Sequence, residues 1–187
     1  MARPTTVPSV SAVIAEFRRA PHEPAGRPPS GVLGLLVGLH HNNVVQWSRE
    51  DAARRDDADD HAVAAAKRDI DALNAKRHEL VEAIDAILAA GLDQNPDAPP
   101  VTESPAMVFD RLSVLVIRMR FTEDAASSQG VDRHLYAARL PVLQEQLALL
   151  QEGLEALFED VLTGRKRFLP YQSLKLYRSQ TAGSRRD

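Results

Sequence analysis

The side chains best suited to chemistry lie along one stripe of a predicted helix. At about 100° per residue they fall within an arc of roughly 140°, which is a single helix face. The stripe begins with apolar residues and continues with polar and ionisable ones, in the order Leu33, Leu36, Val37, His40, Asn43, Trp47, Glu50, Asp51 and Arg54. Because the apolar part has to be buried, we expect the ionisable part to face the interior of a helical bundle as well, where charges need partners.

One hypothesis is an enzyme that uses His40 as a general acid or base, with Glu50 and Asp51 as further catalytic residues. Residues ten apart on a straight helix are separated by about 15 Å, so His40 and Glu50 cannot be in contact. The direct partner of His40 must come from another helix, and we expect Asp71 or Asp110 in that role. A nearby arginine would stabilise developing negative charge.

A second hypothesis is the binding of an anionic small molecule. Arg77 lies near the middle of an apolar helix face that runs from Val63 to Leu88, and Arg111 lies on the next helix. A buried arginine needs a carboxylate, a backbone acceptor or an anionic ligand, and its planar guanidinium matches phosphate and carboxylate groups. The predicted ligand is a phosphorylated metabolite or a nucleotide sugar. The residues expected to hold it are Asn43, Trp47, Arg54, Lys67, Asp71, Asn74, Arg77, Asp110 and Arg111.

A third hypothesis gives the same side chains a structural role. The arginines would pair with the carboxylates in a closed network that fixes the register of the helices, while Trp47 would belong to the core. The protein would then be a structural or interaction protein that acts through its surface. A homodimer built across a two-fold axis is an expected assembly. The sequence leaves all three hypotheses open.

Several kinds of site are excluded or disfavoured. The chain has no cysteine, which rules out disulfides, thiolate ligands and a cysteine nucleophile. It has no Glu-x-x-His pair of the kind that carboxylate-bridged di-iron bundles use, and Glu82 stands where a zincin helix beginning at His78 would need its second histidine. We therefore expect neither a metal nor a cofactor.

The elements that must position these residues are helices, because the sequence has no convincing period-two strand. We predict an all-α protein: an antiparallel bundle of four main helices, with a short helix before it near residues 9–19. The main helices are expected at about 32–55, 60–90, 105–123 and 131–163. Pro141 should kink the last of them or split off its first turns.

The predicted organisation has three parts. Residues 1–30 form an N-terminal segment with a short helix and a Pro/Gly-rich loop, residues 31–164 form the bundle, and residues 165–187 form a basic tail. The last 24 residues carry seven basic side chains and one acidic one, although the whole chain has a net charge of −3. We interpret the tail as a solvated end that Phe168 and Tyr171 attach to the bundle, so nucleic acid is not the expected partner.

The N-terminus lacks a charged region followed by an unbroken apolar run, and the longest apolar stretch, near residues 31–39, is far shorter than the ~20 residues of a membrane span. We therefore expect no membrane association and a location in the cytoplasm.

Four blocks in the right order resemble the bacterial domain-of-unknown-function family numbered 4254. They are LHHNNVVQWSREDAARR, KRDIDALNAKRHELVEAID, ESPAMVFDRLSVLVIRM, and LQEQLALLQEGLEALFEDVLTGRKR with LKLY, and they cover residues 31–177. The shared pattern maps onto His40, Asn43, Trp47, Glu50, Asp51, Arg54, Lys67, Arg68, Ile70, Asp71, Asn74, Arg77, Asp110, Arg111, Leu112 and Ser113. The chain departs from the pattern at AKRHE and at LKLYRSQ. The resemblance implies no assigned activity.

Overall fold

A computed structural model describes residues 7–19, 30–54 and 59–174. These residues form five α-helices: α1 (Val10–Arg19), α2 (Gly31–Ala53), α3 (Asp60–Gly91), α4 (Pro105–Ser127) and α5 (Arg133–Leu162). The prediction of an all-α protein is confirmed. The Pro/Gly-rich loop at residues 20–29 and the basic tail from residue 175 onward lie outside the described residues. No helix in the described part of the chain is long and apolar enough to cross a bilayer.

Local capping signals explain where two of the helices begin. The side chain of Asp59 accepts a hydrogen bond from the backbone N–H of Ala62 at 2.7 Å at the start of α3. Ser104 does the same for Met107 at the start of α4, where Pro105 occupies the first turn. Both capping residues accept a hydrogen bond from the backbone N–H three residues on, as N-cap side chains do.

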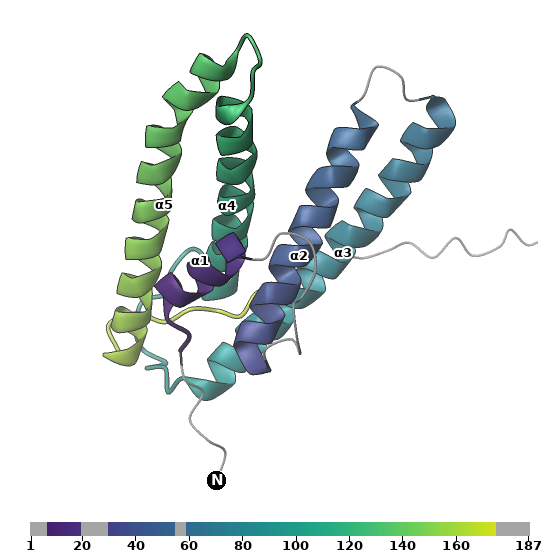
Figure 1. The fold of residues 1–187 in the computed structure, drawn as a ribbon. Helices are drawn as coiled ribbons and strands as arrows, with labels where there is room; N and C mark the ends of the chain where they lie inside the picture. The colour runs from purple at the N-terminus through teal and green to yellow at the C-terminus, as the bar shows by residue number, and fades with distance from the viewer. Residues whose placement is uncertain (1–6, 20–29, 55–58, 175–187) are drawn as a thin grey trace, which may run out of the picture.

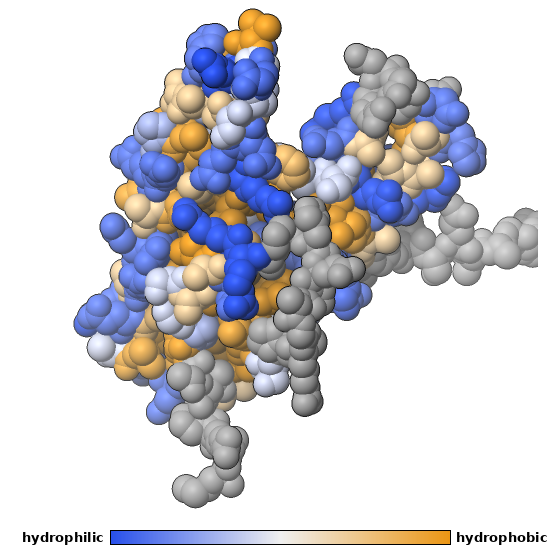
Figure 2. Space-filling view, viewed as in Figure 1, coloured by the Kyte–Doolittle hydropathy of each residue, from blue (hydrophilic) through white to orange (hydrophobic). Residues whose placement is uncertain are grey.

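The four main helices form two antiparallel hairpins, α2 with α3 and α4 with α5 (Figure 1). Both α2 and α3 contact α4, whereas α5 contacts only α4 and α1 among the described helices. The short helix α1 lies across the junction and contacts α2, α4 and α5. In Figure 1 the hairpins meet at one end and diverge towards the end of α2 and the end of α4, and Figure 2 shows a notch between the two lobes there.

The core is centred on α4, which is buried on most of its sides. Phe109 on α4 is fully buried and packs against Phe158 on α5, with ring centroids 6.2 Å apart. The buried residues of α5 are Leu143, Leu147, Leu154, Phe158 and Val161.

One expectation about the elements is narrowed and one is corrected. Of the kink or split expected at Pro141, the split is excluded, because α5 is continuous from Arg133 to Leu162; the proline lies on its exposed side, where one lost backbone hydrogen bond is tolerated. The apolar face of α3 is not buried along its whole length, since Val63 is 39% exposed. The first half of α3 lies beside α2 in the hairpin that diverges from α4 (Figure 1).

Residues 165–174 follow α5 and run back along the end of the molecule where the two hairpins meet. Phe168 is buried, and its N–H donates to Oε1 of Gln94 at 2.8 Å. The carboxylate of Asp85, completely buried on α3, accepts hydrogen bonds from the N–H groups of Ala106 at 2.9 Å and Tyr171 at 3.0 Å. Asp85 therefore connects α3, the start of α4 and the returning segment.

Candidate functional site

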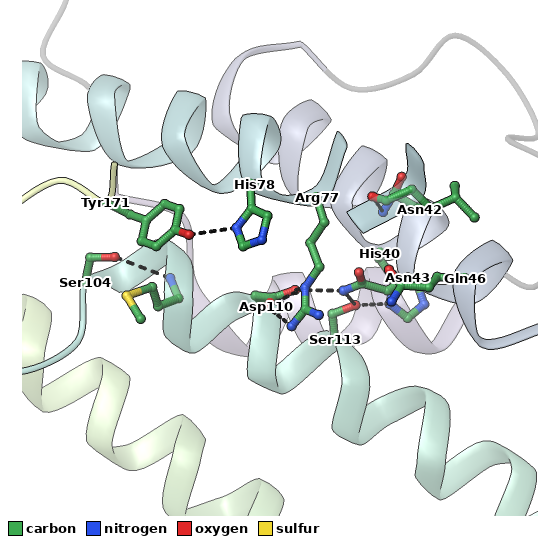
Figure 3. A network of polar contacts seen from close by, with 12 residues as sticks. His40, Asn42, Asn43, Gln46, Arg77, His78, Ser104, Asp110, Ser113 and Tyr171 are labelled. Carbon is green, nitrogen blue, oxygen red and sulfur yellow. Dashed lines mark hydrogen bonds and ion pairs between the residues drawn. The ribbon is translucent and has the colours of Figure 1, made fainter. Parts of the chain in front are cut away.

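Five side chains from α2, α3 and α4 form one hydrogen-bonded chain at the junction of the hairpins (Figure 3). Nε of Arg77 lies 2.9 Å from both carboxylate oxygens of Asp110. Nδ2 of Asn43 donates to Oδ1 of Asp110 at 2.9 Å and to Oγ of Ser113 at 3.1 Å. Oγ of Ser113 lies 2.9 Å from Nδ1 of His40. We call these five residues the central chain.

The hydrogen bonds of the central chain run in one direction, from Asn43 through Ser113 to His40. Ser113 accepts a hydrogen bond from Asn43, so its hydroxyl proton is free to be donated to Nδ1 of His40. An acceptor at Nδ1 places the imidazole proton on Nε2, where the ring can donate to the backbone carbonyl of Phe17. The His40 ring also stacks on the Phe17 ring, with centroids 4.5 Å apart.

His40 is neutral in this environment. Burial lowers the pKa of His40 from 6.5 to about 4, and the positive charges of His41 and Arg120 add to the effect. At the other end of the chain, hydrogen bonds to Asp110 raise the pKa of Arg77 above its ordinary value. The central chain therefore holds a neutral imidazole at one end and a closed ion pair at the other.

The carboxylate partner expected for His40 is wrong. Asp71 is exposed and pairs with Lys67 at 3.7 Å on the surface of α3. Asp110 reaches His40 only through Asn43 and Ser113. A hydroxyl takes the place that we assigned to a carboxylate, and it could have been noticed because Ser113 lies three residues after Asp110 on the same helix face.

The expectation that the end of the stripe faces the interior is also wrong. The side chains of Glu50, Asp51 and Arg54 are 36%, 60% and 71% exposed. Arg54 pairs with Glu50 at 3.3 Å and with Asp51 at 3.9 Å, all within the last turns of α2. These residues lie where α2 and α4 have diverged, near the open end of the two hairpins (Figure 1).

The remaining predicted residues are scattered. Arg111 pairs with Glu103 at the surface, where the two side chains are 54% and 36% exposed. Trp47 is half-buried and stacks on Phe121 of α4, with ring centroids 5.5 Å apart. Asn74 is half-buried on α3. Of the predicted site residues, only His40, Asn43, Arg77 and Asp110 are brought together in the central chain.

Each end of the central chain borders a cavity. His40 lies in the wall of a cavity of about 490 Å³ between α1, α2 and α4. Arg77 and Asp110 border a smaller cavity of about 270 Å³, together with Arg111 and Tyr171. Oη of Tyr171 lies 2.7 Å from Nδ1 of His78 in that second cavity.

The cavity beside His40 contains residues that the sequence did not single out. The other residues around it are Phe17, Arg18, Val44, Ser48, Val116, Ile117, Met119, Arg120, Phe121, Glu123 and Asp124. Neither Arg18 nor Arg120 forms an ion pair with any of the described residues. Their role depends on how α1 crosses α4, a long-range contact that leaves no local sequence signal.

No group of three or more histidine, aspartate or glutamate side chains in the described residues is arranged to hold a metal ion.

The sequence profile of a family described as a protein of unknown function, DUF4254, matches residues 34–169. The chain belongs to this family. The range matched to DUF4254 contains every residue of the central chain, whereas α1, which supplies Phe17 and Arg18, lies outside it. No curated protein and no solved structure matches the chain.

Proposed function

We propose that this protein binds a small anionic molecule in the cavity beside His40. The observation that carries the proposal is the pair of arginines at this cavity, Arg18 from α1 and Arg120 from α4, neither of which forms an ion pair within 4.0 Å of a carboxylate of the described residues, although Glu123 and Asp124 line the same cavity. A guanidinium group that is not held in an ion pair is suited to a carboxylate or phosphate group of a ligand.

The cavity has the size and lining of a small-molecule site. Its volume of about 490 Å³ lies in the range that such sites occupy. Phe17, Val44 and Met119 supply apolar contacts for the body of a ligand. Glu123 and Asp124 also line the cavity and could accept hydrogen bonds from hydroxyl or amino groups. A phosphorylated metabolite that carries hydroxyl groups, such as a phosphorylated sugar or a nucleotide, fits this combination.

The central chain has a supporting role in this proposal. Asp110 already neutralises Arg77, so Arg77 is poorly placed to attract an anion. The third hypothesis, a network that fixes helix register, therefore describes the central chain well, and the ligand site lies beside it. Among the predicted site residues, only His40 belongs to the central chain and also lines the cavity.

The acid–base hypothesis has less support. A general base needs a pKa near the working pH and a free nitrogen, whereas burial holds the pKa of His40 at about 4. Its Nδ1 is also engaged by the hydroxyl of Ser113.

The test is a panel of phosphorylated sugars, nucleotides and nucleotide sugars, scored by thermal shift and then by calorimetry. We expect at least one compound to raise the melting temperature, because a ligand that binds only the folded state stabilises it. Arg120→Met should weaken that binding about 10- to 100-fold, the loss of a hydrogen bond to a charged group.

Arg118→Met is the matched control, because Arg118 is an exposed arginine of the same helix that does not line the cavity. Its affinity should equal that of the unmodified protein. The proposal fails if no compound in the panel binds, or if both variants bind equally well.

A further inference from the structure

The side chains around the cavity beside His40 differ in exposure according to their chemistry. Five of them are only 2% to 5% exposed and are apolar apart from the histidine: Phe17, His40, Val116, Ile117 and Met119. We call these five residues the inner wall. The charged side chains lie nearer to solvent, since Arg18, Glu123 and Asp124 are exposed and Arg120 is half-buried. We call these four residues the charged rim. The cavity therefore has an apolar interior and a charged mouth.

The inner wall offers almost no partner for a polar group of a ligand. His40 is its only polar side chain, and Nδ1 of His40 already lies 2.9 Å from Oγ of Ser113. The backbone at Val116 is in the middle of the continuous helix α4, so its N–H and C=O groups are bonded within that helix. A hydroxyl or charged group placed against this wall would lose its hydrogen bonds to water without replacement, which is unfavourable.

The charged rim suits the opposite kind of group. The guanidinium groups of Arg18 and Arg120 match a phosphate, and the carboxylates of Glu123 and Asp124 can accept hydrogen bonds from hydroxyl groups next to it. Asp124 is one turn beyond Arg120 on α4, roughly 6 Å along the helix axis, so the head group that meets both is compact. The rim and the inner wall therefore require different parts of one ligand.

We propose that the ligand is amphipathic: a soluble phosphate ester with one apolar group, whose phosphate binds at the charged rim and whose apolar group lies against the inner wall. This inference rests on the function proposed above and narrows the phosphorylated metabolites considered there to those with an apolar part. A simple sugar phosphate is polar on all sides, so it would use the rim and leave the inner wall unoccupied. The cavity of about 490 Å³ has room for the apolar part as well as the head group.

A series of alkyl phosphates tests the proposal. Methyl, butyl and hexyl phosphate are titrated into the full chain by calorimetry, below the concentrations at which they aggregate. Each methylene group removed from water should tighten binding about fourfold until the chain fills the cavity. A hexose phosphate, which has the same head group and a polar body, should bind more weakly than hexyl phosphate. Hexanol should also bind far more weakly, because it has no phosphate for the rim.

A pair of neighbouring valines on α2 provides a matched test of where the apolar group lies. Val44 is half-buried and lines the cavity, whereas Val45 is half-buried and lines a separate groove between α2 and α3. Val44→Phe fills part of the cavity, so it should weaken hexyl phosphate at least about tenfold and methyl phosphate much less. Val45→Phe should leave both affinities unchanged. Arg120→Met should weaken every phosphate by the same factor, because the head group is common to all of them.

The outcomes separate this inference from the function on which it rests. If phosphates bind at the cavity but chain length does not change the affinity, or if the two valine variants behave alike, the amphipathic ligand is wrong and the anion site stands. If no phosphate compound binds, including the sugar phosphates and nucleotides of the first panel, both proposals fail.

Vesicles that contain phosphatidic acid distinguish a bilayer lipid from a soluble ester, since both present a phosphate attached to an apolar group. We expect the protein to bind hexyl phosphate in solution and to remain in the supernatant when such vesicles are sedimented. Sedimentation with the vesicles, without binding of the soluble esters, would assign the phosphate to a membrane lipid and overturn the proposal.

Discussion

At the scale of single residues, the two ends of the central chain differ: one is a neutral imidazole and the other is an ion pair. His40 is neutral because Ser113 donates to it and burial disfavours its charged form. Asp110 forms an ion pair with Arg77 and also accepts a hydrogen bond from Asn43. One serine and one asparagine separate the imidazole from the carboxylate, so the two groups do not form the histidine–aspartate pair of an acid–base catalyst.

The neutral state of His40 makes stability depend on pH. The pKa of His40 falls from 6.5 to about 4 on folding, so the unfolded chain binds the proton more tightly. This contribution to the free energy of unfolding is fully present above pH 6.5 and is lost as the pH falls to 4. The pKa difference corresponds to about 3 kcal/mol.

Urea unfolding between pH 7 and pH 4 measures this effect. The comparison is His40→Asn, whose side-chain oxygen can take the place of Nδ1 and accept from Ser113. Over this range the stability of the unmodified protein should decline by more than that of the variant. Parallel pH profiles of the two proteins would show that His40 is not held neutral.

Arg77 is expected to support the folded state through Asp110. The Arg77→Met substitution leaves Asp110 buried without its cation, and should lower the free energy of unfolding by about 3–5 kcal/mol. Arg111→Met removes an arginine from the exposed pair with Glu103 and should cost less than about 1 kcal/mol. Equal losses in chemical denaturation would mean that the Arg77–Asp110 pair is no more important than a surface pair.

At the scale of the elements, the sequence predicts those features that depend only on residues close together in the chain, such as where a helix begins. The starts of α3 and α4 are set by Asp59, Ser104 and Pro105, whose effects reach only a few residues along the chain. The continuity of α5 through Pro141 could not be decided locally, because it depends on whether the rest of the helix is held by α4.

Contacts between distant elements account for what the sequence did not predict at the site. His40 and Ser113 are 73 positions apart, and Asn43 and Asp110 are 67 apart. The stripe of α2 is a single face by helix geometry, but the burial of Glu50 depends on whether α4 stays close to α2 at that point. The periodicity of α2 defines the face and does not show where the neighbouring helix diverges from it.

Asp85 is expected to hold three elements together. Both its oxygens accept backbone N–H groups, from Ala106 and from Tyr171. Asp85→Asn turns one acceptor into a donor that faces an N–H group, which should cost about 1–3 kcal/mol. Asp93→Asn, an exposed site in the following loop, is the control and should be neutral. The substitution should also speed hydrogen exchange at the amide of Tyr171; unchanged exchange and stability would contradict this role.

At the scale of the whole molecule, the two hairpins share a core over only part of their length. No described side chain between residues 61 and 79 is buried, whereas Val81, Ile84, Asp85 and Leu88 are. The junction that contains the central chain is therefore the part where α2, α3 and α4 stabilise one another.

The position of α1 has a consequence for the diversity of the family. The matched range of residues 34–169 contains the central chain and the α2 and α4 walls of the cavity, but α1 closes the cavity from outside that range. Substitutions in α1 can therefore change the shape and charge of the cavity while the central chain stays intact. If the cavity is the ligand site that we propose, substitutions in α1 alone would change which ligand it accepts.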